Sequence, residues 1–248
     1  LELVDRVTRL VGANAGRFGY TQSPTMFGQT QGDLMLPPGR VGDRYRAAFP
    51  EYGNFQTTGD IRELTDAGIP QEVVNVWHER FPTGLNALQI AAVNEHSIFS
   101  GNSLMVVAPT SAGKTFVGEL AAIKAVADGK KAVFLLPYKA LVNEKFEDFS
   151  DLYGERLGLR IARCSGDWQD QVSTVLRGKY DIAFFTYEKF LSLSISSPHL
   201  LNQMGLIVLD EAQFITEPGR GMVVELLLTS MVGARQRGVS TQLITLSA

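Results

Sequence analysis

The sequence has little cysteine or histidine and no long apolar run. Its one cysteine, Cys164, excludes an intrachain disulfide, and the three histidines do not combine with it at metal-ligand spacing. No apolar run approaches the roughly 20 residues that a membrane-spanning helix needs. No charged segment followed by an apolar core marks a signal peptide at the start. We therefore expect an intracellular protein, cytoplasmic or nuclear, without membrane contact and without a cysteine or histidine metal site.

An excess of basic residues is also absent. The formal net charge of −3 and a pI near 5.7 argue against a protein that holds nucleic acid through bulk positive charge. Any such binding must be local, through a few donors in a groove. At 248 residues, with 45% hydrophobic and 20% charged residues, the chain has the composition of an ordinary globular protein of one large or two small domains.

Glycine and proline are concentrated in the first part of the chain. Residues 1–60 hold nine of the 24 glycines and four of the ten prolines, which predicts turns, short strands and loops. We interpret this part as an accessory segment and a candidate surface for protein partners. The start at Leu1, without a methionine, indicates a fragment or a trimmed chain.

Beyond residue 60 the pattern becomes that of an α/β fold. Helical spacing predicts short helices over 60–68 and 69–81 and a longer one over 85–101. Short apolar runs then alternate with helical segments and predict strands at 104–108, 132–137, 181–186, 206–210 and 242–247. Because these runs are continuously apolar, we expect a parallel sheet that helices cover on both faces.

A phosphate-binding loop is predicted at residues 108–115, which read APTSAGKT. The loop follows a predicted strand and opens a predicted helix, where unpaired backbone N–H groups attract anions. Lys114 would neutralise the β- and γ-phosphates, the Thr115 hydroxyl would ligate Mg²⁺, and Gly113 would let the backbone approach closely. The phosphate-binding residues of the loop would be Thr110, Ser111, Ala112, Gly113, Lys114 and Thr115. The strict pattern begins with glycine, where this chain has Ala108.

A pair of carboxylates follows another predicted strand in LIVLDEAQ. Asp210 comes at the end of the apolar run, at the edge of an α/β sheet where ligands bind, and Glu211 follows it. Asp210 can hold Mg²⁺ and Glu211 can polarise the attacking water, the division of labour that phosphoryl transfer to water needs. The alternative is that the pair only caps the next helix. Together with Lys114, these residues are the predicted catalytic set.

APTSAGKT, DEAQ and the LSA ending at Ala248 resemble, in this order, the motifs of superfamily-two helicases of the DExH type, most closely the superkiller-like group. The resemblance covers about residues 65–248. It implies that residues 61–248 form a first RecA-like ATP-binding domain, with ATP and Mg²⁺ as cofactors and single-stranded DNA or RNA as the partner.

The resemblance also assigns binding residues. Gln89 resembles the glutamine that reads the adenine edge, since an amide offers both a donor and an acceptor. PYKALVNEK and TYEK resemble strand-gripping motifs, which makes Pro137, Lys139, Thr186 and Lys189 nucleic-acid-binding candidates. Gly166, in Ser165-Gly166-Asp167, resembles part of a further strand-contacting loop.

Two departures from the family pattern matter. Gln213 stands where the group usually carries histidine, so an amide would couple hydrolysis to the LSA motif, in which Ser247 lies. The second RecA-like domain, which supplies arginine fingers, is absent from this sequence. We therefore expect the chain alone to bind nucleotide weakly and to hydrolyse it poorly.

Three interpretations stay open. The leading one is a helicase motor domain, with DNA slightly favoured over RNA because GRGMVVELLLT (219–229) resembles the DNA-acting members. A second is a nucleotide-gated module that binds nucleic acid or protein without unwinding. A third is a translocase on duplex DNA within a defence complex.

Overall fold

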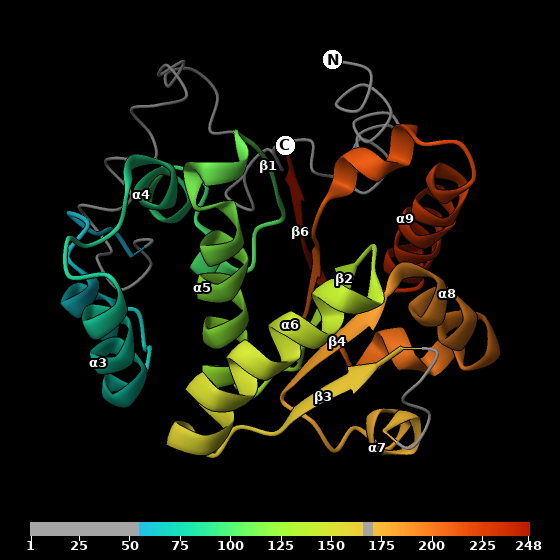
Figure 1. Ribbon diagram of the computed structural model, residues 1–248, viewed down its shortest axis with the longest axis horizontal. Helices are drawn as coiled ribbons and strands as arrows, with labels where there is room; N and C mark the ends of the chain where they lie inside the picture. The colour runs from blue at the N-terminus through green and yellow to red at the C-terminus, as the bar shows by residue number, and fades with distance from the viewer. Residues whose placement is uncertain (1–54, 166–170) are drawn as a thin grey trace, which may run out of the picture.

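The computed structural model describes residues 55–165 and 171–248, and a six-stranded sheet stands at its centre (Figure 1). All neighbouring strands pair in parallel, in the order β1-β6-β5-β2-β4-β3. The strands are β1 Leu104–Val107, β2 Ala132–Leu136, β3 Ile161–Cys164, β4 Ile182–Thr186, β5 Leu206–Leu209 and β6 Gln242–Ser247. The predicted accessory segment, residues 1–60, lies almost entirely outside the described residues.

Helices connect the strands and cover both faces of the sheet. The α-helices are α3 Gln71–Arg80, α4 Ala87–Asn94, α5 Lys114–Ala127, α6 Lys139–Phe149, α7 Val172–Leu176, α8 Tyr187–Ser196 and α9 Arg220–Gln236. Shorter 3-10 segments are η3 Ile61–Thr65, η4 Ile98–Ser100, η5 Thr110–Ala112, η7 Pro198–Gln203 and η8 Ala212–Thr216, and a π-helical turn, η6 Ser150–Glu155, continues α6. No helix in the described ranges is long and apolar enough to cross a bilayer.

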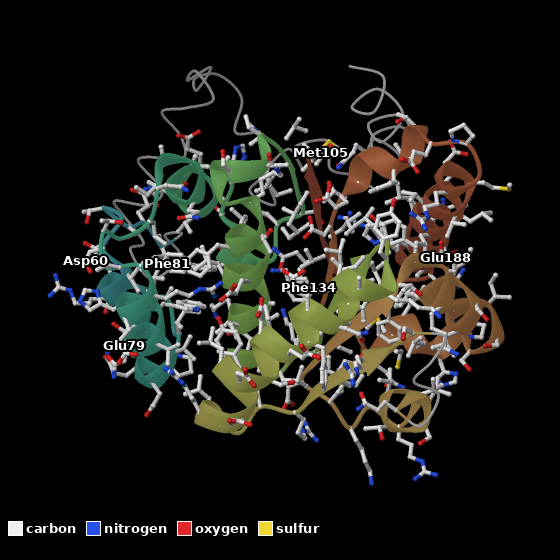
Figure 2. The ribbon with its side chains drawn as sticks, in the orientation of Figure 1. Asp60, Glu79, Phe81, Met105, Phe134 and Glu188 are labelled. Carbon is white, nitrogen blue, oxygen red and sulfur yellow. The ribbon has the colours of Figure 1, made fainter. Side chains whose placement is uncertain are left out.

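The core has two halves, one on each side of the sheet. One half packs the sheet against α3, α4, α5 and α6, and the other packs it against α7, α8 and α9 (Figure 1). Successive residues of a strand enter opposite halves: Phe134, labelled in Figure 2, joins the first, while Val133 and Leu135 join the second. Burial on both faces explains the continuous apolar runs, and the predicted α/β fold is confirmed.

One strand was absent from the sequence prediction. β3 is one of the two edge strands of the sheet and pairs only with β4, and its four residues alternate between half-buried and buried. The half-buried Arg163 donates to Asn143 and lies 4.4 Å from the Phe146 ring centroid. Because Arg163 interrupts its apolar residues, this four-residue strand lacks the continuous run by which the other five were recognised.

The predicted helix over 85–101 was wrong in its length. α4 ends at Asn94, and Ser97 adopts a left-handed conformation with φ 51° before the short η4. The helix expected over 60–68 is the 3-10 turn η3, in which the Asp60 side chain accepts from the Arg62 amide. Both differences lie in helices too short for periodicity to locate their ends.

Candidate nucleotide and nucleic-acid site

The loop 108–113 leaves the sheet at the carboxyl end of the edge strand β1. β1 pairs with β6, and the Ala108 amide extends the pairing by donating to the Ser247 carbonyl at 3.2 Å. The chain then passes through η5 to Gly113, whose φ of 78° lies in the left-handed region that favours glycine, and α5 begins at Lys114. The first helical turn therefore presents its free N–H groups at the carboxyl edge of the sheet, which suits an anion.

Gly113 lies too close to α4 to carry a side chain. A Cβ atom built there would stand 2.7 Å from Gln89 Nε2 and 2.9 Å from Asn86 Nδ2. Both amides hold the loop, because Gln89 donates to the Gly113 carbonyl at 3.2 Å and Asn86 donates to the Ala112 carbonyl at 3.1 Å. The start of α4 thus fixes the backbone that would contact phosphate.

Gln89 also closes a capping box at the start of α4. Its Oε1 accepts from the Asn86 amide at 2.9 Å, and Asn86 Oδ1 accepts from the Gln89 amide at 3.1 Å. A glutamine amide has two hydrogens and two acceptor lone pairs, and these contacts use one of each. One donor and one acceptor are left, which is the pair that an adenine edge requires.

Lys114 is 8% exposed and bends back over its own loop. Its ammonium group donates to the carbonyls of Ala108 at 2.5 Å and Pro109 at 2.9 Å. Thr115 is half-buried on the first turn of α5, while Thr110 and Ser111 are exposed. The loop therefore brings one cation, the half-buried Thr115 hydroxyl and several backbone donors to one place.

A cleft of about 470 Å³ opens beside this loop. It is lined by Gln89, Gly113 and Thr115 from the predicted site and by Arg80 and Phe81 from the end of α3, among others. Phe81, labelled in Figure 2, lies 4.4 Å from Phe116 of α5, measured between ring centroids, and the Arg80 guanidinium lies 5.0 Å from the Phe81 centroid. Planar groups of this kind suit a nucleobase.

A buried carboxylate forms the floor of the cleft. Glu119 is 3% exposed and accepts hydrogen bonds from Tyr153 of η6 and from Arg80 at 3.1 Å, while Trp77 donates to the Tyr153 oxygen at 2.6 Å. Burial raises the pKa of Glu119, against the opposing effects of Arg80 and the Tyr153 hydroxyl. This network joins α3, α5 and η6 behind the cleft.

The acidic pair lies at the end of β5, which β6 separates from β1. Asp210 is 8% exposed, and its Oδ1 accepts from the Glu211 amide at 2.9 Å. Burial raises the pKa of Asp210 to about 6; the Glu211 amide opposes the rise, the Glu211 charge adds to it, and Lys145 and Lys114 oppose it. A carboxylate held in so dry a place gains from a cation, and a hard oxygen donor fits Mg²⁺.

Glu211 has an unusual backbone. Its φ of 55° and ψ of 42° place a non-glycine residue in the left-handed region, which costs roughly 1 to 2 kcal/mol. The turn directs β5 into η8, and the Phe214 amide donates to the Glu211 carbonyl at 3.1 Å. Strain of this kind persists where surrounding contacts hold it, and it gathers at functional sites.

Gln213 lies between the acidic pair and the LSA motif. Its Nε2 donates to the Glu211 carboxylate, and its Oε1 accepts from the Ala248 amide at 3.2 Å. Ser247 is 1% exposed in β6. Gln213 therefore contacts both the acidic pair and the backbone at the end of the LSA motif, and its part in coupling stays a prediction.

The four described nucleic-acid candidates line one open groove of about 530 Å³. Pro137 and Lys139 follow β2, and Thr186 and Lys189 lie where β4 enters α8. Thr186 Oγ1 accepts from the Lys189 amide at 3.3 Å and so caps α8. Gly166, the fifth candidate, lies outside the described residues.

Comparison with known proteins assigns the family. The DEAD/DEAH box helicase family matches residues 86–248. The chain belongs to this family. This helicase-family chain is 35% identical over 175 residues to the ATP-dependent DNA helicase Hel308 of Pyrococcus abyssi, with 70% of this chain and 24% of the relative covered. The Hel308 protein of Thermococcus kodakarensis is 36% identical over 70% of this chain and 15% of its own length.

The helicase fold is also found in a solved structure. A crystal structure of the DUF1998 helicase MrfA superposes with a TM-score of 0.60 and 21% identity, over 73% of this chain and 29% of that one. At this identity the likeness concerns the fold alone. The chain spans less than a third of the length of each of these relatives.

Several residues around the helicase site were absent from the sequence prediction of site residues. Tyr138, Phe214 and Arg220 form one cluster at the groove, where the Arg220 guanidinium lies 4.1 Å from the Tyr138 centroid and 3.6 Å from Glu188, which is labelled in Figure 2. In the cleft, Phe81 follows the last turn of α3 and precedes Pro82. This sequence context predicts the end of a helix and does not indicate a binding site. Tyr187 lies within the TYEK motif, but the sequence did not show that its side chain is buried and contacts the acidic pair.

Proposed function

We propose that residues 61–248 form the first RecA-like motor domain of an ATP-dependent helicase. The observation that supports this most strongly is the placement of Lys114, Thr115, Asp210 and Glu211 at the carboxyl ends of β1 and β5, on either side of β6. A cation and a hydroxyl thus stand near two carboxylates at one sheet edge. Hydrolysis of a phosphoanhydride needs this combination of groups.

In this proposal each residue has one task. Lys114 and the amides of the loop hold the β- and γ-phosphates, Gln89 contacts the base, and Glu211 orients and polarises the attacking water. Thr115 and Asp210 would hold Mg²⁺, which neutralises developing phosphate charge when bound. Gln213 links the Glu211 carboxylate to the LSA motif through the contacts described above.

Single-stranded DNA is the proposed track, along the groove of Pro137, Lys139, Thr186 and Lys189. The named relatives are DNA helicases, which favours DNA over RNA. Within the family we propose the superkiller-like group, which APTSAGKT, DEAQ and the LSA motif resemble, and its DNA-acting members in particular because of GRGMVVELLLT. We further propose that a second RecA-like domain supplies arginine fingers, as the resemblance to superfamily-two helicases implies.

The test is ATP hydrolysis by the full-length protein with single-stranded DNA, with single-stranded RNA and with neither. Glu211→Gln serves as the inactive variant. Glu217→Gln, the same change at an exposed position six residues later, is its matched control. We expect DNA to stimulate the wild type and Glu217→Gln, and we expect no stimulation of Glu211→Gln.

Each other outcome points to a different function. Stimulation by RNA alone would move the track to RNA. Stimulation by neither polymer would instead favour the nucleotide-gated module, or the duplex-DNA translocase if double-stranded DNA stimulates hydrolysis. Full activity of Glu211→Gln would overturn the assignment of the acidic pair.

A further inference from the structure

Tyr187 joins the groove to the acidic pair, and it has no role in the proposed binding of nucleotide or nucleic acid. It is the first residue of α8, directly after Thr186, and its side chain is fully buried. Its hydroxyl donates to the Asp210 carbonyl, with the Glu211 carbonyl as a second acceptor at 3.3 Å. The peptide unit between the two carboxylates is therefore held by a residue whose chain neighbours line the groove.

The contact acts on a strained point of the backbone. Glu211 is one of two described non-glycine residues with positive φ, and the direction of its carboxylate depends on that turn. Asp210 is fixed on its other side, because its amide donates to the Leu135 carbonyl of β2 at 3.0 Å. The Tyr187 hydroxyl thus holds the carbonyl of a residue whose own amide is already anchored to β2.

The other end of the link is the first turn of α8. Thr186 and Lys189, one on each side of Tyr187, line the groove, and their mutual hydrogen bond makes that turn a single unit. A polynucleotide phosphate that binds these two residues would shift or stiffen the turn. Tyr187 has a rigid aromatic side chain whose hydroxyl contacts the carbonyls directly, so the movement would reach the Asp210-Glu211 peptide without passing through other side chains.

We infer that Tyr187 is a positioning residue that couples nucleic-acid binding in the groove to the orientation of Glu211. The inference rests on the proposed function and extends it, because it specifies how the track would stimulate hydrolysis. Tyr187 touches neither nucleotide nor nucleic acid in this scheme. It acts through the backbone of the acidic pair.

The test compares two changes from tyrosine to phenylalanine. Tyr187→Phe removes the hydroxyl and keeps the ring. Tyr180→Phe is the matched control: Tyr180 is equally buried, and its hydroxyl has no hydrogen-bond partner among the described residues. In both variants of the full-length protein, hydrolysis is measured with and without single-stranded oligo(dT), together with the KM for ATP and the affinity for the oligonucleotide.

We expect Tyr187→Phe to lower the ratio of stimulated to unstimulated hydrolysis about tenfold, the effect of one buried hydrogen bond. The KM for ATP and the oligonucleotide affinity should change less than about twofold, and Tyr180→Phe should behave as wild type. A wild-type ratio in Tyr187→Phe would overturn the inference. Equal loss of both rates would overturn it too, because that result indicates a structural role only.

A second measurement covers the case in which Tyr187→Phe does not fold. Hydrogen exchange of the wild-type amides at 211–214 should slow when oligo(dT) is added, and unchanged exchange would overturn the inference. Failure of the proposed function is seen separately, in the wild type: without stimulated hydrolysis that Glu211→Gln abolishes, the helicase proposal fails and the coupling fails with it.

Discussion

Removing the charge of Asp210 should stabilise the metal-free fold. Its carboxyl has a pKa of about 6 in the folded protein against 3.8 for an ordinary aspartate, chiefly because it is buried. At about 1.36 kcal/mol per pKa unit, the charged form costs the fold up to about 3 kcal/mol. Asparagine keeps the oxygen that accepts from the Glu211 amide and removes the charge. We expect Asp210→Asn to raise the free energy of unfolding by about 1 to 3 kcal/mol at pH 7.5, and the Tm by several degrees.

The pH dependence distinguishes this cause from a packing effect. A carboxyl whose pKa is raised by folding is destabilising while it is ionised, so the cost is present at pH 7.5. It declines as the pH falls through about 6 and is gone below the unfolded value of 3.8. The advantage of Asp210→Asn should therefore shrink with falling pH.

The assay is thermal unfolding of the chain with EDTA, from pH 4 to pH 8. The comparison variant changes an aspartate whose pKa is lowered by folding instead of raised. Burial opposes ionisation of Asp181, but the hydrogen bonds and charge of Arg160 outweigh it and lower the pKa of Asp181. Asp181→Asn removes that ion pair and should destabilise the fold at neutral pH. A Tm of Asp210→Asn below that of the wild type, or a Tm difference between the two that does not change with pH, would refute the reasoning.

Two further predictions concern the loop and α9. Lys114→Ala should weaken ATP binding more than about tenfold in calorimetry while the Tm stays near that of the wild type, and the exposed Lys179→Ala should bind normally; equal affinities would contradict the phosphate-binding assignment. Gly221→Ala should cost roughly 1 to 3 kcal/mol in urea unfolding, because its Cβ would stand 2.2 Å from the Ile215 carbonyl oxygen. Gly233→Ala, in the same helix, meets only a flexible arginine at 3.5 Å and should gain up to about 1 kcal/mol.

The strands were predictable where burial on both faces gives a continuous run of apolar residues. Strands β2, β4 and β5 are buried on both faces, so their apolar residues run without a break. β3 has one partner strand and an arginine in its middle, so the same rule missed it. Local periodicity also could not show that the chain after Asn94 turns into the left-handed Ser97.

The site divides in the same way. Motifs of adjacent residues placed the loop 108–115 and the pair at Asp210, because the backbone geometry of each is set within a few positions. The Trp77–Tyr153 bond joins residues 76 positions apart, and the Gln213–Ala248 bond joins residues 35 apart. The Trp77–Tyr153 bond leaves no signal in one sequence, since a buried tyrosine has the same residue type whatever its partner. The link from Gln213 to the LSA motif was expected only through the family resemblance.

Glu211 receives hydrogen bonds from two different parts of the domain. Gln213 contacts its carboxylate and the backbone after β6, on the side of the nucleotide loop. Tyr187 contacts its peptide from α8, on the side of the groove. The Glu211 carboxylate extends from this strained turn, so we expect a movement of either contact to change its direction. Loss of the Gln213 contact should then disturb hydrolysis with or without a polynucleotide, whereas loss of the Tyr187 contact should be felt mainly when the groove is filled.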